Sequence, residues 1–173
     1  MEKLNRIAKL FLFLTATFFV IWLGGYIARH ILVYNLFDNE LVLRDKFTVE
    51  NLTPVFHTSY GVIILNAVSF LLFLINFILF LIFSKMKLKN EGWLFIISAI
   101  IFITAPFEIY LSIIDYDIIK NILIGSFSNS DILSLFKERI KSLSSFSMIE
   151  IFSYFGILYM YIFKPFRKVK NEN

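Results

Sequence analysis

Few residues in this sequence are of types that carry out catalysis or hold metals. Its two histidines, His30 and His57, lie in separate segments, and it has no cysteine. A zinc-type site needs three or four ligands, so these two histidines predict none. Asp115-Tyr116-Asp117 resembles the acidic pair with which some transferases hold a divalent cation, but it also fits polar residues that end a helix at a membrane interface. Because no nucleophile-elbow, P-loop or zinc-protease motif occurs, we predict no catalytic site, no metal site and no cofactor.

Four polar residues within apolar segments are more informative, namely Arg29, Asn66, Glu108 and Glu150. Charged side chains inside membrane spans are costly and usually face a partner or a cavity. Counted from the ends of their segments, all four lie about 6–9 Å below the same boundary. We therefore predict a polar layer in which Arg29 pairs with Glu108 or Glu150, and Asn66 hydrogen-bonds nearby. The layer could lock helix packing, receive a partner's polar group, line a pathway, or consist of side chains that reach the interface separately.

The segments that carry these residues are long and apolar. Each is long enough to cross a hydrocarbon core of roughly 30 Å as a helix, and the helical form follows because lipid offers the backbone no hydrogen-bond partners. The first segment follows basic residues as a signal sequence does, but it is longer than a signal core and lacks a small-residue cleavage site. We interpret it as a retained span. The four predicted spans are Leu10–Val33, Tyr60–Phe83, Trp93–Ile114 and Phe146–Phe163.

The composition agrees with a membrane protein. Apolar residues make up 58% of the chain, whereas average soluble proteins have about 45–50%. A chain of 173 residues normally forms one domain. We therefore predict an all-α, polytopic membrane protein, with a single domain over residues 1–173 that is built as a four-transmembrane-helix bundle.

The distribution of basic residues predicts the orientation of this bundle. The N-terminus, the loop between the second and third spans, and the C-terminal tail together carry ten Lys and Arg, against seven on the other side. The ten lie within a few residues of the span ends, where the positive-inside bias acts. Both termini are therefore predicted to be cytoplasmic, and the loops 34–59 and 115–145 to face outward.

The second outer loop contains an amphipathic pattern. Ser130-Asp131 could cap a helix that runs to about Leu143. Its apolar residues recur at helical spacing with charged residues between them, which predicts a helix that lies on the membrane surface or folds over the bundle. Within the spans, Gly24-Gly25 should allow close helix approach, and Pro106 should kink the third span.

The first outer loop resembles a known family. The stretches Leu41-Val42-Leu43-Arg44, Glu50-Asn51-Leu52 with Pro54, and Thr58-Ser59-Tyr60 are similar to the corresponding region of colicin A-type immunity proteins. The architecture of that family is also similar, with four spans, cytoplasmic termini, a short basic inner loop and a basic tail. The family often has a Thr-Thr-Ala-Gly-like stretch after its third span, and here residues 122–126 read Ile-Leu-Ile-Gly-Ser instead.

The resemblance implies a protein of the bacterial inner membrane that binds a pore-forming bacteriocin. It would contact the toxin's hydrophobic helical hairpin within the lipid bilayer and prevent the pore from opening, without nucleic acid or any reaction. Two other hypotheses remain open at this point. One is a small oligomeric channel or an accessory membrane protein of a defence or secretion system. The other is a membrane enzyme that acts on lipid or glycan, with Asp115 and Asp117 near the interface.

Overall fold

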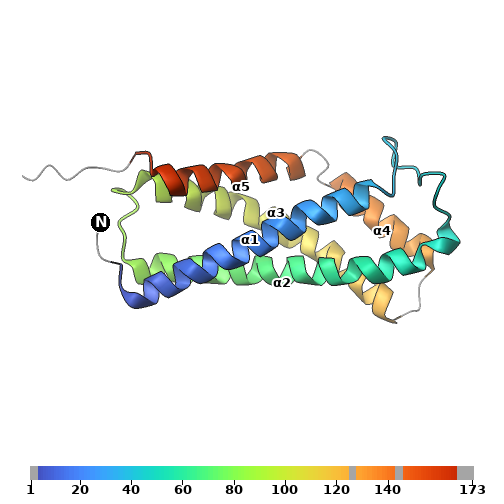
Figure 1. The fold of residues 1–173 in the computed structure, drawn as a ribbon, viewed down its shortest axis with the longest axis horizontal. Coiled ribbons are helices and arrows are strands. Elements are labelled where there is room, and N and C mark those ends of the chain that lie inside the picture. The colour runs from blue at the N-terminus through green and yellow to red at the C-terminus, as the bar shows by residue number, and fades with distance from the viewer. Residues whose placement is uncertain (1–3, 125–127, 143–145, 167–173) are drawn as a thin grey trace, which may run out of the picture.

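The computed structural model describes residues 4–124, 128–142 and 146–166. This part of the chain is all-helical, as predicted, with five α-helices and one short 3₁₀-helix (Figure 1). Their bounds are Arg6–Tyr34 for α1, Val49–Asn51 for η1, Thr53–Ser84 for α2, Gly92–Ile124 for α3, Asn129–Ser142 for α4 and Phe146–Phe163 for α5.

Three of these helices, α1, α2 and α3, are long and apolar enough to cross a membrane. Large apolar side chains remain exposed along them, such as Val20, which is 64% exposed, and Ile103, which is 65% exposed. A soluble protein buries such side chains or scatters them singly, whereas a lipid-facing helix displays them along its length. The chain therefore has the features of a membrane protein.

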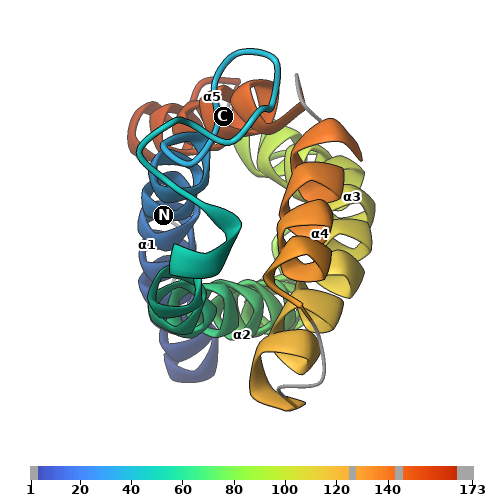
Figure 2. The same ribbon diagram turned by 90° about the vertical axis from the view of Figure 1, so that its right-hand side faces the viewer.

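The helices lie lengthwise in an elongated bundle (Figure 1). α1 and α2 form a long antiparallel pair, and α5 packs on the first half of α3. α4 packs on the second half of α3, at the end of the bundle opposite the N-terminus. An end-on view shows α4 and α3 on one side and α1 on the other (Figure 2).

Two helices begin earlier than predicted. α1 starts at Arg6 because the side chain of Asn5 caps it, accepting a hydrogen bond from the Ala8 amide at 2.6 Å. α2 starts at Thr53, seven residues before the predicted span, with Pro54 in its first turn. Proline fits the first turn of a helix, since its missing N–H would have no partner there. α5 has the bounds that were predicted for the fourth segment.

α3 corrects the predicted end of the third segment. We expected it to stop at Ile114, with Asp115 beginning the loop, but the helix continues ten residues further to Ile124. Ile114, Ile118 and Ile122 extend its buried stripe at helical spacing. The charge of Asp115 does not end the helix because two arginines surround it there.

α4 begins with a capping interaction two residues before the one predicted. Ser128, rather than Ser130, is the cap: the Asp131 amide donates to its hydroxyl oxygen at 3.3 Å, and the Asp131 carboxylate accepts from the Ser128 amide at 3.1 Å. This reciprocal arrangement satisfies two backbone N–H groups at the helix start. The predicted end at Leu143 lies outside the described residues.

The interior has two apolar clusters, one in each half of the bundle. The first is rich in aromatic rings from α1, α2, α3 and α5, including Trp22, Phe73 and Tyr154. The second joins the other ends of α1, α2 and α3 to α4 and to the loop after α1, through Phe37, Leu52 and Phe136. α4 and this loop therefore close the end of the bundle opposite the N-terminus.

Candidate functional site

A buried carboxylate with two arginines lies between the two halves of the bundle. Asp115 of α3 accepts from both terminal nitrogens of Arg29, with Nη1 at 2.5 Å from Oδ2 and Nη2 bonded to Oδ1. Nε of Arg139, on α4, donates to the same Oδ1 at 2.8 Å. All three side chains are at most 8% exposed. A buried charge is tolerated only when it is paired and hydrogen-bonded. Asp115 is the paired and hydrogen-bonded partner of both buried arginines, Arg29 on α1 and Arg139 on α4.

This geometry corrects the predicted pairing of Arg29. We expected Arg29 to pair with Glu108 or Glu150, but its guanidinium forms a bidentate pair with Asp115. Asp115 lies two helical turns after Glu108 on the same face of α3. It therefore contacts Arg29 from a position further along the helix than the one we predicted. The bidentate geometry is the strong form of arginine–carboxylate contact.

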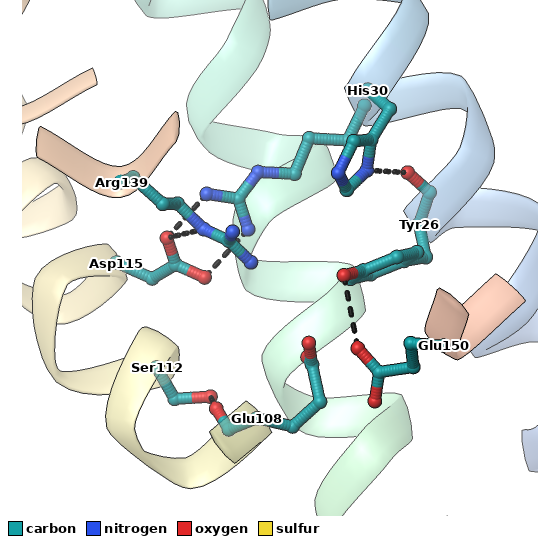
Figure 3. Close-up of polar contacts among 8 residues, drawn as sticks. Tyr26, His30, Glu108, Ser112, Asp115, Arg139 and Glu150 are labelled. Carbon is teal, nitrogen blue, oxygen red and sulfur yellow. Dashed lines mark hydrogen bonds and ion pairs between the residues drawn. The ribbon is translucent and has the colours of Figure 1, made fainter. Parts of the chain in front are cut away.

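The two glutamates form a second, adjacent group. Glu108 is 4% exposed and Glu150 is fully buried, and their carboxyl groups lie beside one another (Figure 3). The hydroxyl of Tyr26 donates to Oε2 of Glu150 at 3.1 Å. Within the described residues, Oε1 of each glutamate has no hydrogen-bond partner. The fold gathers Arg29, Glu108 and Glu150 into one cluster with Asp115 and Arg139, and the hydrogen bonds differ from those expected. Their common depth in a membrane stays a prediction.

The formal charges of this cluster do not cancel when every group is ionised. It contains two guanidinium groups and three carboxyl groups, which come from α1, α3, α4 and α5. Figure 3 shows the members on α3, α4 and α5. One proton held by the pair of glutamates would be enough to neutralise the cluster. Because buried charge is expensive in a low-dielectric interior, the cluster holds these four helices in one arrangement.

Asn66 does not make the hydrogen bond that was predicted for it. Its side chain is buried on α2, and within the described residues neither its Nδ2 nor its Oδ1 has a partner. It lies against Gly25 of α1, where an added Cβ would overlap with the Asn66 amide. Gly25 therefore permits the close approach of α1 and α2, as the adjacent glycines predicted. Gly24 faces open space instead.

Replacing Gly25 with leucine is expected to destabilise the fold by about 1–3 kcal/mol, because the new side chain would overfill the contact with Asn66. Unfolding in detergent micelles, followed by circular dichroism during titration with a denaturing detergent, measures this change. Leucine at Gly24 is the matched control, since nothing lies within 4 Å of a Cβ at that position. Equal loss of stability in both variants would contradict the contact.

The residues considered for metal binding are engaged elsewhere or lie apart. Both oxygens of Asp115 accept from arginines, and Asp117 is exposed on another face of α3. Nδ1 of His30 lies 2.9 Å from the Tyr26 carbonyl oxygen, whereas the ring of His57 contacts Tyr60. Among the described residues, no three His, Cys, Asp or Glu side chains gather to form a metal site. We therefore interpret Asp115 as the ion-pair partner of two arginines that holds helices together, and not as half of a metal-binding pair with Asp117.

Sequence reasoning missed Asp115 and Arg139 as members of the cluster. A signal for each was present in the helical spacing. Arg139 falls on the same stripe as Ile132 and Phe136, which marks the buried face of α4. Asp115 falls in the stripe that continues from Leu111 to Ile118. A charged residue on a buried stripe indicates a partner across the interface.

Several polar side chains in the other half of the bundle bond to carbonyls of their own helices. Thr15 donates to the Phe11 carbonyl at 2.7 Å, Asn76 to that of Leu72 at 2.7 Å, and Ser98 to that of Leu94 at 2.8 Å. Aromatic and aliphatic side chains surround them. The charged cluster is therefore confined to one part of the bundle, between the two apolar clusters.

No protein-family model matches the chain, and no curated protein or solved structure is significantly similar to it.

Proposed function

We propose that α1, α2, α3 and α5 each cross the bacterial inner membrane, with both termini in the cytoplasm. α5 is an apolar helix over Met148–Phe163, with Glu150 as its one charged residue, and it packs lengthwise on α3, which supports its assignment as the fourth span. The basic residues Arg6, Lys9, Lys85, Lys87 and Lys89 lie at the same end as the N-terminus. Lys3 and the tail residues Arg167, Lys168 and Lys170 lie outside the described residues. In this orientation α4 is the amphipathic helix of the second outer loop.

Cysteine labelling tests the orientation without interference, because the chain has no native cysteine. Asn39→Cys and Ser134→Cys should react with a membrane-impermeant maleimide added to spheroplasts, because both positions would be external. Lys87→Cys should react only after the membrane is opened. All three side chains are exposed in the fold, so burial does not limit the reaction. Labelling of Lys87→Cys in intact spheroplasts would contradict the orientation.

The function that this arrangement supports best is immunity to a pore-forming bacteriocin. The protein would bind the toxin's hydrophobic helical hairpin inside the bilayer and prevent pore opening. The observation that carries this proposal is an outward-facing pair of small residues, Gly24 and Ala28, one turn apart on α1. Gly24 has open space around it, whereas the adjacent Gly25 is already used by α2. Small residues at this spacing allow another helix to approach closely in a membrane.

Two further observations support helix binding. The outer surfaces of α1, α2, α3 and α5 display large apolar side chains, such as Val20, Ile82, Ile103 and Phe152, which can contact another apolar helix. The segment from Leu41 to Tyr60, which carries the resemblance to colicin A-type immunity proteins, comprises part of the loop after α1, η1 and the start of α2. It packs at the end of the bundle through Leu52 and Phe56. In the proposed orientation this end faces the side from which a toxin arrives.

The interior favours a binding protein over a channel. Ions cross a bilayer along a continuous polar path, but the charged cluster occupies only part of the length of this bundle. The half beyond it is lined by aromatic and aliphatic side chains, and the hydroxyl groups of Thr15 and Ser98 there bond to carbonyls of their own helices. A conducting form would need several copies to enclose a path between them.

Survival of toxin-sensitive cells tests the proposal. Cells that express the protein should survive at least one pore-forming bacteriocin from a panel, and should remain sensitive to nuclease bacteriocins. Gly24→Leu should abolish this protection while the protein stays folded and membrane-inserted, because leucine would keep the toxin helix away from α1. Val20→Leu, on an exposed position one turn earlier, is the control and should protect fully. Sensitivity to every pore-forming toxin despite normal membrane insertion would refute the proposal.

A further inference from the structure

An apolar cavity of about 90 Å³ lies between the four long helices, in the half of the bundle that holds the N-terminus. Each helix contributes to its wall, with Ala16 from α1, Phe77 from α2, Ile97 from α3 and Ile157 from α5. The hydroxyl of Thr15 also lies in the wall, but it is bonded to the carbonyl of Phe11. A cavity that presents almost only carbon does not hold ordered water, because water needs polar partners.

A basic side chain is held against two aromatic rings that line this cavity. Nζ of Lys164, just after α5, lies 5.4 Å from the ring centroid of Trp93 and 5.6 Å from that of Tyr161. Both rings belong to the cavity wall. Within the described residues Lys164 forms no salt bridge with an acidic side chain. The nearby Glu91 accepts from the indole N–H of Trp93 at 2.5 Å. Lys164 therefore offers its ammonium group to an anion beside the cavity.

The surroundings of Lys164 strengthen this positive potential. The described residues at this end of the bundle include five other basic side chains, whereas Glu91 is the one acidic side chain among them. The five are Arg6, Lys9, Lys85, Lys87 and Lys89. Basic pockets between transmembrane helices on the cytoplasmic side are suited to anionic lipid headgroups, which are abundant in that leaflet.

We propose that the cavity and Lys164 together bind an anionic phospholipid. One acyl chain enters the cavity, and the phosphate contacts the Lys164 ammonium. A second protein helix is about 10 Å across and does not fit a space of this size. An acyl chain is thinner and is present throughout the bilayer, and the headgroup of an anionic phospholipid brings the negative charge that the basic rim complements. This site rests on the proposed orientation but not on toxin binding.

Native mass spectrometry of the full-length protein tests the acyl-chain part of the site. The protein is extracted from nanodiscs that contain phosphatidylglycerol or phosphatidylcholine with identical acyl chains. The wild type should retain one phosphatidylglycerol in preference to phosphatidylcholine. Ala16→Phe, at the open side of the cavity wall, should block the cavity and lose both lipids. Val20→Phe, one turn further along the same exposed face and outside the cavity wall, should retain them like the wild type.

Lys164→Gln tests the headgroup contact. The variant should still retain lipid but should lose about fivefold of its preference for phosphatidylglycerol, as expected for one basic residue at an anionic surface. Lys87→Gln makes the same change of charge at the same end, away from the two rings, and should keep most of the preference. If the two variants lost the preference equally, general attraction of the lipid to a basic surface would explain it, and the proposal would be overturned.

Quenching of tryptophan fluorescence tests the site without filling the cavity. In a Trp22→Phe background, Trp93 is the remaining tryptophan and lies in the cavity wall. Phosphatidylglycerol with brominated acyl chains should quench it more strongly than brominated phosphatidylcholine. Equal quenching by the two lipids, or a mass spectrum in which a second copy replaces lipid, would overturn the proposal. Because these readouts need no toxin, they can fail or succeed independently of the immunity proposal.

Discussion

Replacing Asp115 with alanine should lower the free energy of unfolding by about 3–5 kcal/mol, among the largest effects expected for this protein. The carboxylate neutralises Arg29 and Arg139, which are both buried and have no other ion-pair partner within the described residues. Its removal leaves two cations in a low-dielectric interior and releases α4 from α3. Denaturant titration in micelles, followed by circular dichroism, measures the loss.

Two comparisons separate this effect from a general loss of charge. Asp117→Ala removes a carboxylate two residues away on an exposed position of α3, and should change stability little. The triple variant Arg29→Met, Asp115→Leu, Arg139→Met replaces the whole cluster with apolar residues, and should recover most of the stability that Asp115→Ala loses. A stable Asp115→Ala protein, or a triple variant that is as unstable as Asp115→Ala, would contradict this account of the cluster.

Replacing Trp22 with alanine should cost about 3–5 kcal/mol, because it leaves a large cavity among packed rings. Trp22 is 1% exposed, and its ring centroid lies 4.6 Å from that of Tyr154, 5.3 Å from that of Tyr26 and 5.4 Å from that of Phe70. Between membrane helices, such packing provides much of the association energy, since lipid is as apolar as the side chains themselves. Thermal unfolding in the same micelles measures the change.

Phe152→Ala is the matched control for this prediction. Phe152 is another large aromatic side chain, but it is 67% exposed on α5 and contacts lipid in the proposed arrangement. Its removal leaves no internal cavity and should change stability by less than about 1 kcal/mol. If both variants were equally unstable, general loss of apolar surface rather than packing around Trp22 would explain the result.

The helices could be predicted from the sequence because runs of apolar residues are a strong and local signal. The predicted positions of the helix ends were less accurate where tertiary contacts extend a helix beyond its apolar run. α3 continues past Asp115 because Arg29 and Arg139 neutralise a charge that sequence alone interprets as the end of a span. The two arginines lie 86 and 24 residues away along the chain, so no local pattern shows this contact.

The sequence predicted that three of the polar residues lie near one another, but it did not predict which of them pair. Counting residues from the span ends put Arg29, Glu108 and Glu150 at one predicted depth, and the fold brings these three side chains into one cluster. Which residues pair depends on the rotation of each helix about its axis and on where α4 packs. Counting residues from the span ends gives neither of these. For the same reason, Asn66 was expected to find a partner but instead packs its amide against Gly25.

Channel activity of a pore-forming bacteriocin in lipid vesicles tests the proposed mode of action most directly. Potassium efflux that the pore-forming domain causes should fall when this protein is present in the same membrane, while the amount of toxin bound to the vesicles stays unchanged. Gly24→Leu protein should fail to reduce the efflux, and Val20→Leu protein should reduce it like the wild type. Undiminished efflux with the wild-type protein, for the toxin against which it protects cells, would contradict antagonism within the membrane.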